Sequence, residues 1–119
     1  MPFSHVVVWL DQTEAHVIHF GREAADFDTI KTGSAHPHGH VHGATHPGFY
    51  RDVTNAVKDA SEILIVGPGL SKTAFHKHLQ AHHPDVAGHV VGVEPVDHPR
   101  DAQLLSYARH YFLKVDIMR

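Results

Sequence analysis

Apolar and polar residues alternate in short runs over the first third of the chain. Two runs at residues 6–10 and 15–20, rich in valine and aromatic residues, predict a β-hairpin around the turn "DQTE". Asp11 opens that turn, where aspartate is common because its carboxylate accepts hydrogen bonds from the backbone that follows. A third strand is predicted near Phe27 to Lys31.

The pattern then changes to a helical period. Apolar residues recur at i, i+4, i+7, i+8 and i+11 from Phe49 to Ala60, which is typical of an amphipathic helix. The run "EILIVGPG" predicts a short strand that is buried on both faces and stopped by Gly67, Pro68 and Gly69.

A second helix is predicted to begin at Ser71, a favourable N-cap residue, with Leu70 and Phe75 packed as a hydrophobic staple. It should end before Pro84, because the residue before a proline is disfavoured in the helical conformation. The run "HVVGVEP" predicts one more strand. The last helix is expected to have Pro99 in its first turn, and its buried stripe comprises Leu104, Leu105, Ala108, Tyr111, Phe112 and Val115.

The resulting order, β-β-β-α-β-α-β-α, predicts the α/β class. We expect a three-layer sandwich with a mixed five-stranded sheet, in the order typical of RNase H-like folds. A three-layer sandwich of another topology is the alternative. Residues 1–119 show no internal repeat and no linker, so one domain is expected.

Composition narrows the classes of function. The chain has 119 residues, a formal net charge of -3 and 15 histidines, which gain charge below about pH 6.5. The lack of a basic excess argues against an autonomous nucleic-acid binder, and DNA is not an expected partner. Without cysteine, any metal site must use nitrogen and oxygen ligands. No apolar run is long enough to span a bilayer, so no membrane partner is expected. The absence of cysteine is consistent with a reducing cytoplasm, which is the expected location.

The segment "KTGSAHPHGHVHGATHPG" is the most unusual in the chain. Alternation in an extended backbone would place most of its histidines on one side, where neutral imidazoles could bind Zn or Ni. On the second helix, His78 and His82 lie one turn apart and could also chelate a metal, whereas His83 should point elsewhere. A solvated polar loop and a binding loop are the alternatives, and a connection of roughly sixteen residues favours a loop with a function. The histidines of the segment are His36, His38, His40, His42 and His46.

Catalytic patterns are weak. The stretch "VGPGLSK" places Lys72 at a helix start that could hold a phosphate, but neither nucleotide-binding glycine motif is present. The alternative is that "VGPGLSK" is simply a tight connection between a strand and a helix. For a two-metal nuclease, Asp11 is the one carboxylate at a plausible position, and no serine lies in a nucleophile elbow.

Three segments together point to a family: "VVWLDQTEAHVIHF", "EILIVGPGLSKTAFHKHL" and "VVGVEPVDHPRDAQLLSYARHYF". Over about residues 5–113 the chain resembles small bacterial proteins called translational machinery proteins. These are single-domain relatives of the central domain of archaeal and eukaryotic peptide-chain release factors and of Pelota. The patterns "LIVGPG-x-x-K" and "DHP-x-D-x-QL" are the most specific parts of the resemblance.

The resemblance implies an RNase H-like fold and a partner in the ribosome, tRNA or rRNA. In release factors the loop after the third strand carries a GGQ tripeptide that promotes hydrolysis of peptidyl-tRNA. The corresponding segment here has no GGQ and no glutamine, which implies an accessory protein of translation without that activity. The five loop histidines, with Lys31, Arg51 and Lys72, are the candidate RNA contacts. A metal-binding protein is the alternative, and the edge strands of the sheet leave a homodimer open.

Overall fold

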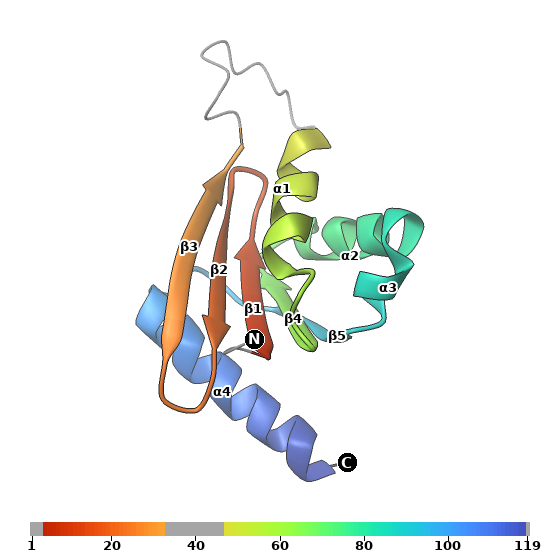
Figure 1. The fold of residues 1–119 in the computed structure, drawn as a ribbon. Coiled ribbons are helices and arrows are strands. Elements are labelled where there is room, and N and C mark those ends of the chain that lie inside the picture. Colours follow the sequence, from red (N-terminus) through yellow and green to blue (C-terminus); the bar gives the residue numbers. More distant parts are fainter. Residues whose placement is uncertain (1–3, 33–46, 119) are drawn as a thin grey trace.

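The computed structural model describes residues 4–32 and 47–118. It contains a five-stranded sheet with the strand order β3-β2-β1-β4-β5 (Figure 1). The β1–β2 and β2–β3 pairs are antiparallel, whereas β1–β4 and β4–β5 are parallel. The strands are β1 (His5–Leu10), β2 (Glu14–Phe20), β3 (Ala25–Lys31), β4 (Glu62–Gly67) and β5 (Val90–Pro95).

Helices cover both faces of this sheet. The helices are α1 (Pro47–Val57), α2 (Ser71–His82), α3 (Pro84–Ala87) and α4 (Asp101–Met118). The helices α1, α2 and α3 lie on one face and α4 lies on the other (Figure 1). The predicted α/β class, the mixed five-stranded sheet and the three-layer arrangement are therefore confirmed.

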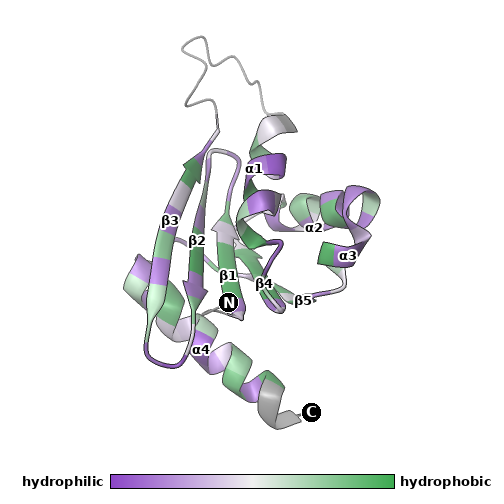
Figure 2. Cartoon of the chain, in the orientation of Figure 1, coloured by the Kyte–Doolittle hydropathy of each residue, from purple (hydrophilic) through white to green (hydrophobic). Residues whose placement is uncertain are grey.

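The core is divided in two by the sheet. Alternate residues of a strand point to opposite faces. In β1, Val6, Val8 and Leu10 pack under α1 and α2, while Val7 and Trp9 pack under α4. This two-sided burial explains why β1 and β4 read as continuous apolar runs. The edge strand β3 is mostly exposed and carries both polar and apolar residues, as its mixed colouring in Figure 2 shows.

Gly67 is required where β4 leaves the sheet. A Cβ atom at this position would lie 2.3 Å from the carbonyl oxygen of Leu10, so any larger residue would force the two backbones apart. The close approach brings the end of β4 directly against the end of β1. Gly69, two residues further on, has open space where its Cβ would be.

The second helix begins at Ser71, as predicted, but the predicted N-cap and hydrophobic staple are wrong. The N-cap residue of α2 is Leu70, in a helical conformation, and no side chain caps the helix. Ser71 is instead the first helical residue and is buried. No staple forms, because Leu70 is 83% exposed while Phe75 is fully buried. The predicted end is correct, since α2 stops at His82, before Pro84.

Other boundaries also differ from the prediction. The strand β3 begins at Ala25 rather than near Phe27, because its pairing with β2 extends to Phe20. Pro99 precedes α4, which begins at Asp101. The four-residue helix α3 is too short to show a period, although Pro84 at its first position favours it. The predicted stripe of α4 is confirmed, with Leu104, Ala108 and Phe112 buried. Within residues 4–32 and 47–118, no helix is both long and apolar enough to cross a membrane.

Candidate functional site

The candidate site lies at one end of the sheet, which we call the loop end. It is the edge formed by Leu10, Glu14, Lys31, Gly67 and Pro95, where β1, β3, β4 and β5 finish and β2 begins. β3 ends and α1 begins on this side of the molecule (Figure 1), and residues 33–46 lie between them in the sequence. In open α/β sheets, ligands bind beyond the carboxyl ends of the parallel strands. The topology therefore directs attention to this end.

Asp11 organises the turn between β1 and β2. Its Oδ1 accepts hydrogen bonds from the backbone N–H of Thr13 (2.8 Å), the Thr13 hydroxyl (2.9 Å) and the backbone N–H of Glu14 (3.0 Å). Burial acts to raise the pKa of Asp11, but these hydrogen bonds and the nearby His98 together hold that pKa below its ordinary value. The expectation that Asp11 is a turn residue is therefore confirmed.

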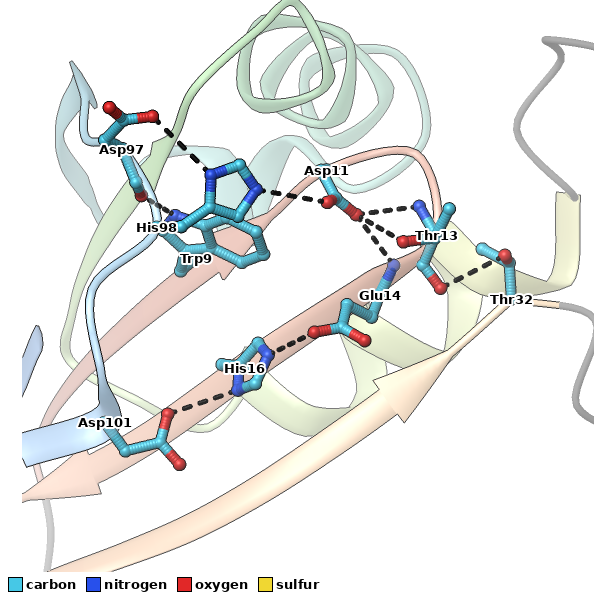
Figure 3. A network of polar contacts seen from close by, with 9 residues as sticks. All are labelled: Trp9, Asp11, Thr13, Glu14, His16, Thr32, Asp97, His98 and Asp101. Atoms are coloured by element: carbon cyan, nitrogen blue, oxygen red, sulfur yellow. Dashed lines mark hydrogen bonds and ion pairs between the residues drawn. The ribbon is translucent and has the colours of Figure 1, made fainter.

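The same turn holds the end of β3. The backbone N–H of Thr32 donates to the carbonyl of Thr13 at 2.9 Å, and the Thr32 hydroxyl contacts the same oxygen at 3.2 Å (Figure 3). Thr32 is the last described residue before segment 33–46. The end of β3 is therefore held beside the β1–β2 turn.

A cavity lies between this turn and the β4–α2 connection, and its size is in the range of small-ligand sites. Its volume is about 370 Å³, and it is lined by Asp11, Gln12, Thr13 and residues 68–71. The N-terminus of α2 favours an anion there, but the Asp11 carboxylate opposes one. The ammonium group of Lys72 is held in place, because its Nζ donates a hydrogen bond to the carbonyl of Gly69 at 2.5 Å. A phosphate at "VGPGLSK" would therefore be favoured by the start of α2 but repelled by the Asp11 carboxylate of the β1–β2 turn.

On the α4 side of the loop end, Trp9 is tied to the segment after β5. Its indole N–H donates to the backbone carbonyl of Asp97 at 2.6 Å, and the His98 ring lies 5.0 Å from the indole, centroid to centroid. His98 Nε2 is 3.9 Å from Asp11 Oδ2, and its Nδ1 is 3.5 Å from Asp97 Oδ1 (Figure 3). His98 therefore lies between two carboxylates from separate parts of the chain.

His16 bridges β2 and α4. Its Nε2 is 2.6 Å from Glu14 Oε2 and its Nδ1 is 3.2 Å from Asp101 Oδ1 (Figure 3). A neutral imidazole has one N–H, so only the doubly protonated ring can donate to both carboxylates. These side chains and Trp9 surround a cavity of about 230 Å³.

The prediction that Asp11 is the one carboxylate at a plausible position is wrong. Glu14, Asp97 and Asp101 lie at the same end of the sheet, because the segment after β5 packs across the end of β1. These acids contact histidine or threonine side chains. Among the described residues, no three His, Asp or Glu side chains are grouped so that they could hold a metal ion. The carboxylates therefore give no support to a two-metal nuclease.

The sequence contained a signal for part of this network. Asp97, His98 and Asp101 belong to "DHP-x-D-x-QL", one of the two most specific parts of the family resemblance. Trp9 and His16 carried no comparable signal, because they read as ordinary strand positions. The structure shows that the motif builds the wall opposite Trp9.

The structure describes only some of the predicted RNA contacts. Lys31 is the last residue of β3 and pairs with Glu14 in the β2–β3 register, and Arg51 is exposed on α1. Lys72 lies in the first turn of α2, so all three cations belong to elements that meet the loop end. The remaining candidates, His36, His38, His40, His42 and His46, lie outside the described residues.

The predicted histidine pair on α2 is brought together. The rings of His78 and His82 are 4.9 Å apart, centroid to centroid. The expectation that His83 points elsewhere is wrong, because its ring is 5.7 Å from that of His78. The helix ends at His82, so the backbone at His83 no longer follows the helical rotation. Burial, together with the charges of His82 and His83, lowers the pKa of His78. Its Nε2 is buried and has no hydrogen-bond partner among the described residues.

Comparison with solved structures finds a similar fold in one domain-sized part of several longer proteins. The chain is similar to the Pelota protein of Archaeoglobus fulgidus, with 13% identity and a TM-score of 0.68, over 92% of this chain and 32% of that one. An archaeal translation termination factor matches with 12% identity and a TM-score of 0.62, over 96% and 38% of the two chains. Saccharomyces cerevisiae Dom34 matches with 13% identity and a TM-score of 0.59, over 87% and 31%. Dom34 is a translation termination-like factor involved in RNA quality control pathways.

The amino-acid sequence itself matches no protein-family model and no curated protein. At identities of 12–13% the structural likeness establishes the fold. The expected relation in fold to Pelota and release factors is confirmed. This chain spans about a third of the length of each of these proteins. Membership of the bacterial family named above stays a prediction.

Proposed function

We propose that this chain is a non-enzymatic accessory protein of translation that binds the ribosome, tRNA or rRNA through its loop end. The observation that carries the proposal is the fold that the chain shares, over 92% of its length, with Pelota at a TM-score of 0.68. Two other proteins of this fold are a translation termination factor and a translation termination-like factor. Such a partner would place the protein in the cytoplasm.

The position of segment 33–46 supports the choice of surface. It follows β3, where the family resemblance locates the functional loop of release factors, and the Thr32 contacts hold the end of β3 beside the β1–β2 turn. Lys31 and Arg51 flank it, and the segment's own histidines supply further aromatic rings and, when protonated, positive charge. Without GGQ, we propose no peptidyl-tRNA hydrolysis.

The charge balance of the loop end sets the conditions for binding. Four carboxylates, Asp11, Glu14, Asp97 and Asp101, lie at the end of the sheet where β3 ends in Lys31 and α2 begins with Lys72 in its first turn, so at neutral pH the surface is mixed rather than basic. Protonation of the histidines in segment 33–46 would offset the carboxylates. Binding to RNA should therefore strengthen as the pH falls from about 7.5 to about 6, and weaken steeply with salt.

Co-sedimentation with purified ribosomes at about 50 mM salt tests the proposal. We expect binding that is largely lost at about 200 mM salt, and that falls when His38, His40 and His42 are replaced by glutamine. The matched control replaces three exposed histidines elsewhere, His82, His89 and His110, by glutamine and should bind as the parent does. Absence from the ribosomal pellet at low salt would reject the proposal.

A metal-binding function is the second candidate, because α2 presents His78 and His82 together with His83. The described residues offer no complete set of three ligands, so Zn or Ni binding would draw further ligands from the loop histidines. Protein purified without an affinity tag should then contain stoichiometric metal that is released below about pH 6. Metal-free protein with weak, unselective uptake would rule this function out.

A further inference from the structure

A third cavity lies at the opposite end of the sheet, which we call the far end. The far end is formed by His5, Phe20, Ala25, Glu62 and Val90, where β1, β3, β4 and β5 begin and β2 finishes. The helix α4 starts beside His16 at the loop end, and its Phe112 packs against His5 at the far end. The cavity between this helix and the ends of β1 and β2 has a volume of about 350 Å³, within the usual range of small-molecule sites.

The floor of the far-end cavity is aromatic. The rings of His5, Phe20 and Phe112 contact one another, with centroid distances of 4.7 Å for His5–Phe112, 5.6 Å for Phe20–Phe112 and 5.8 Å for His5–Phe20. Leu113 lies at the rim and is 58% exposed. Mutual packing fixes the three rings, so an apolar group entering the cavity meets a preformed surface.

Two arginines line the same cavity. Arg109 Nη2 donates to the carbonyls of Gly21 (3.3 Å) and Ala24 (3.4 Å), both long contacts. Its Nε is buried and has no acceptor among the described residues. Arg22 is exposed on the turn between β2 and β3. A buried guanidinium N–H normally has an acceptor, so this one is an unused donor beside an apolar floor.

Among the residues that the structure describes, no acidic side chain lines the far-end cavity, although Glu23 follows Arg22 in the same turn. Glu62 lies 2.8 Å from His5 Nε2, on β4. Within residues 4–32 and 47–118, neither Arg22 nor Arg109 forms an ion pair with a carboxylate. The described lining of the far-end cavity therefore carries two guanidinium groups and no carboxylate, although the chain as a whole has a net charge of -3.

The lining also limits the kind of anion. The cavity residues carry aromatic, aliphatic and guanidinium groups, and none of them has a side-chain amide, hydroxyl or carboxyl group. The guanidinium groups supply only hydrogen-bond donors, and the His5 imidazole of the lining is engaged by Glu62, so the cavity favours a ligand whose polar end accepts hydrogen bonds. It suits an apolar body that ends in a carboxylate, which a guanidinium binds well.

We propose that the far-end cavity binds a small amphipathic carboxylate, an aromatic or branched aliphatic acid whose apolar body lies on Phe20 and Phe112 and whose carboxylate meets Arg109 and Arg22. This site is separate from the loop end and does not depend on the function proposed there.

The test is titration of the full chain, labelled with 15N, with 3-phenylpropionate, and with its neutral amide as the matched ligand. We expect the acid to shift the backbone amide signals of Gly21, Phe112 and Leu113, and the neutral amide to bind about tenfold more weakly. Arg109→Met and Arg22→Gln should each weaken binding of the acid at least about threefold, while Arg51→Gln at the loop end should not. Arg22 is exposed, so its variant decides the matter if Arg109→Met does not fold.

Three results would overturn the inference. One is equal binding of the acid and the neutral amide, which would remove the role of the arginines. Another is a set of shifts at the loop end with none at Gly21, Phe112 or Leu113. The third is a short RNA that shifts these amide signals and binds more tightly than the acid does.

Discussion

The two ends of the sheet treat their polar groups differently. At the loop end, Asp11 accepts three hydrogen bonds within its own turn, His16 contacts Asp101 of α4, and the Trp9 indole donates to the segment after β5. At the far end, the contacts of Arg109 are long and one of its N–H groups has no acceptor among the described residues. Polar groups at the loop end thus position backbone, whereas those at the far end retain binding capacity. The variants below test this contrast.

The largest effect is expected for Trp9→Ala. Trp9 is 3% exposed, and its loss would remove a large core side chain and leave the carbonyl of Asp97 without its donor. We expect the free energy of unfolding to fall by about 3–5 kcal/mol, measured by urea denaturation. Trp9→Phe keeps most of the apolar contact and should cost only about 1–2 kcal/mol. Equal losses in both variants would mean that the hydrogen bond, not packing, dominates.

Gly67→Ala should be the next most harmful change. The added Cβ would collide with the Leu10 carbonyl and separate the ends of β1 and β4, at a cost of about 1–3 kcal/mol. Gly69→Ala is the matched control, since its Cβ would enter open space and should change stability by less than about 0.5 kcal/mol. Thermal unfolding of both variants measures the difference. Similar melting temperatures would contradict the close approach.

Asp11→Ala should cost about 1–2 kcal/mol, because three donors in the turn lose their acceptor. Asp11→Asn keeps an oxygen acceptor but removes the charge, and it isolates the pH dependence. The pKa of Asp11 is lowered in the folded state, so its charged form adds stability above about pH 4, which is lost as the pH falls through the folded pKa.

The stability difference between the parent and Asp11→Asn should therefore be present at neutral pH and should shrink below about pH 4. Denaturant curves collected between about pH 7 and pH 3 measure this. A difference that grows as the pH falls would have the wrong sign.

The smallest effect is expected at the far end. Arg109→Met keeps much of the apolar stem. It loses two long hydrogen bonds, which destabilises the fold, but it also removes a buried donor without an acceptor, which stabilises it. We expect a change of less than about 1 kcal/mol in the free energy of unfolding. A loss as large as that of Trp9→Ala would show that Arg109 is mainly structural. The contrast between the two ends would then fail.

The element order was predictable because burial dominates it. The strands β1 and β4 are covered on both faces, and the stripe of α4 follows the helical period, so both leave clear patterns. The N-cap of α2 was not predictable from residue preference, because Leu70 takes the cap position although its side chain has no hydrogen-bond acceptor. The four residues of α3 are fewer than a helical period needs to become visible.

Most of the loop-end network was not predictable, for a different reason. Trp9 meets Asp97 across 88 positions of sequence and His16 meets Asp101 across 85, so no local pattern joins them. The sequence motif identified only Asp97, His98 and Asp101. These residues lie opposite Trp9 and His16 because β5 pairs with β4, and β4 pairs with β1.

The central claim is that the loop end, and not the far end, contacts the ribosome. The direct measurement is ribosome affinity by co-sedimentation at about 50 mM salt, for the double variant Arg51→Gln/Lys72→Gln and for Arg22→Gln in parallel. We predict that the double variant loses about tenfold or more in affinity and a salt slope smaller by about two, while Arg22→Gln binds as the parent does. Equal losses in the two variants, or a loss confined to Arg22→Gln, would contradict the account.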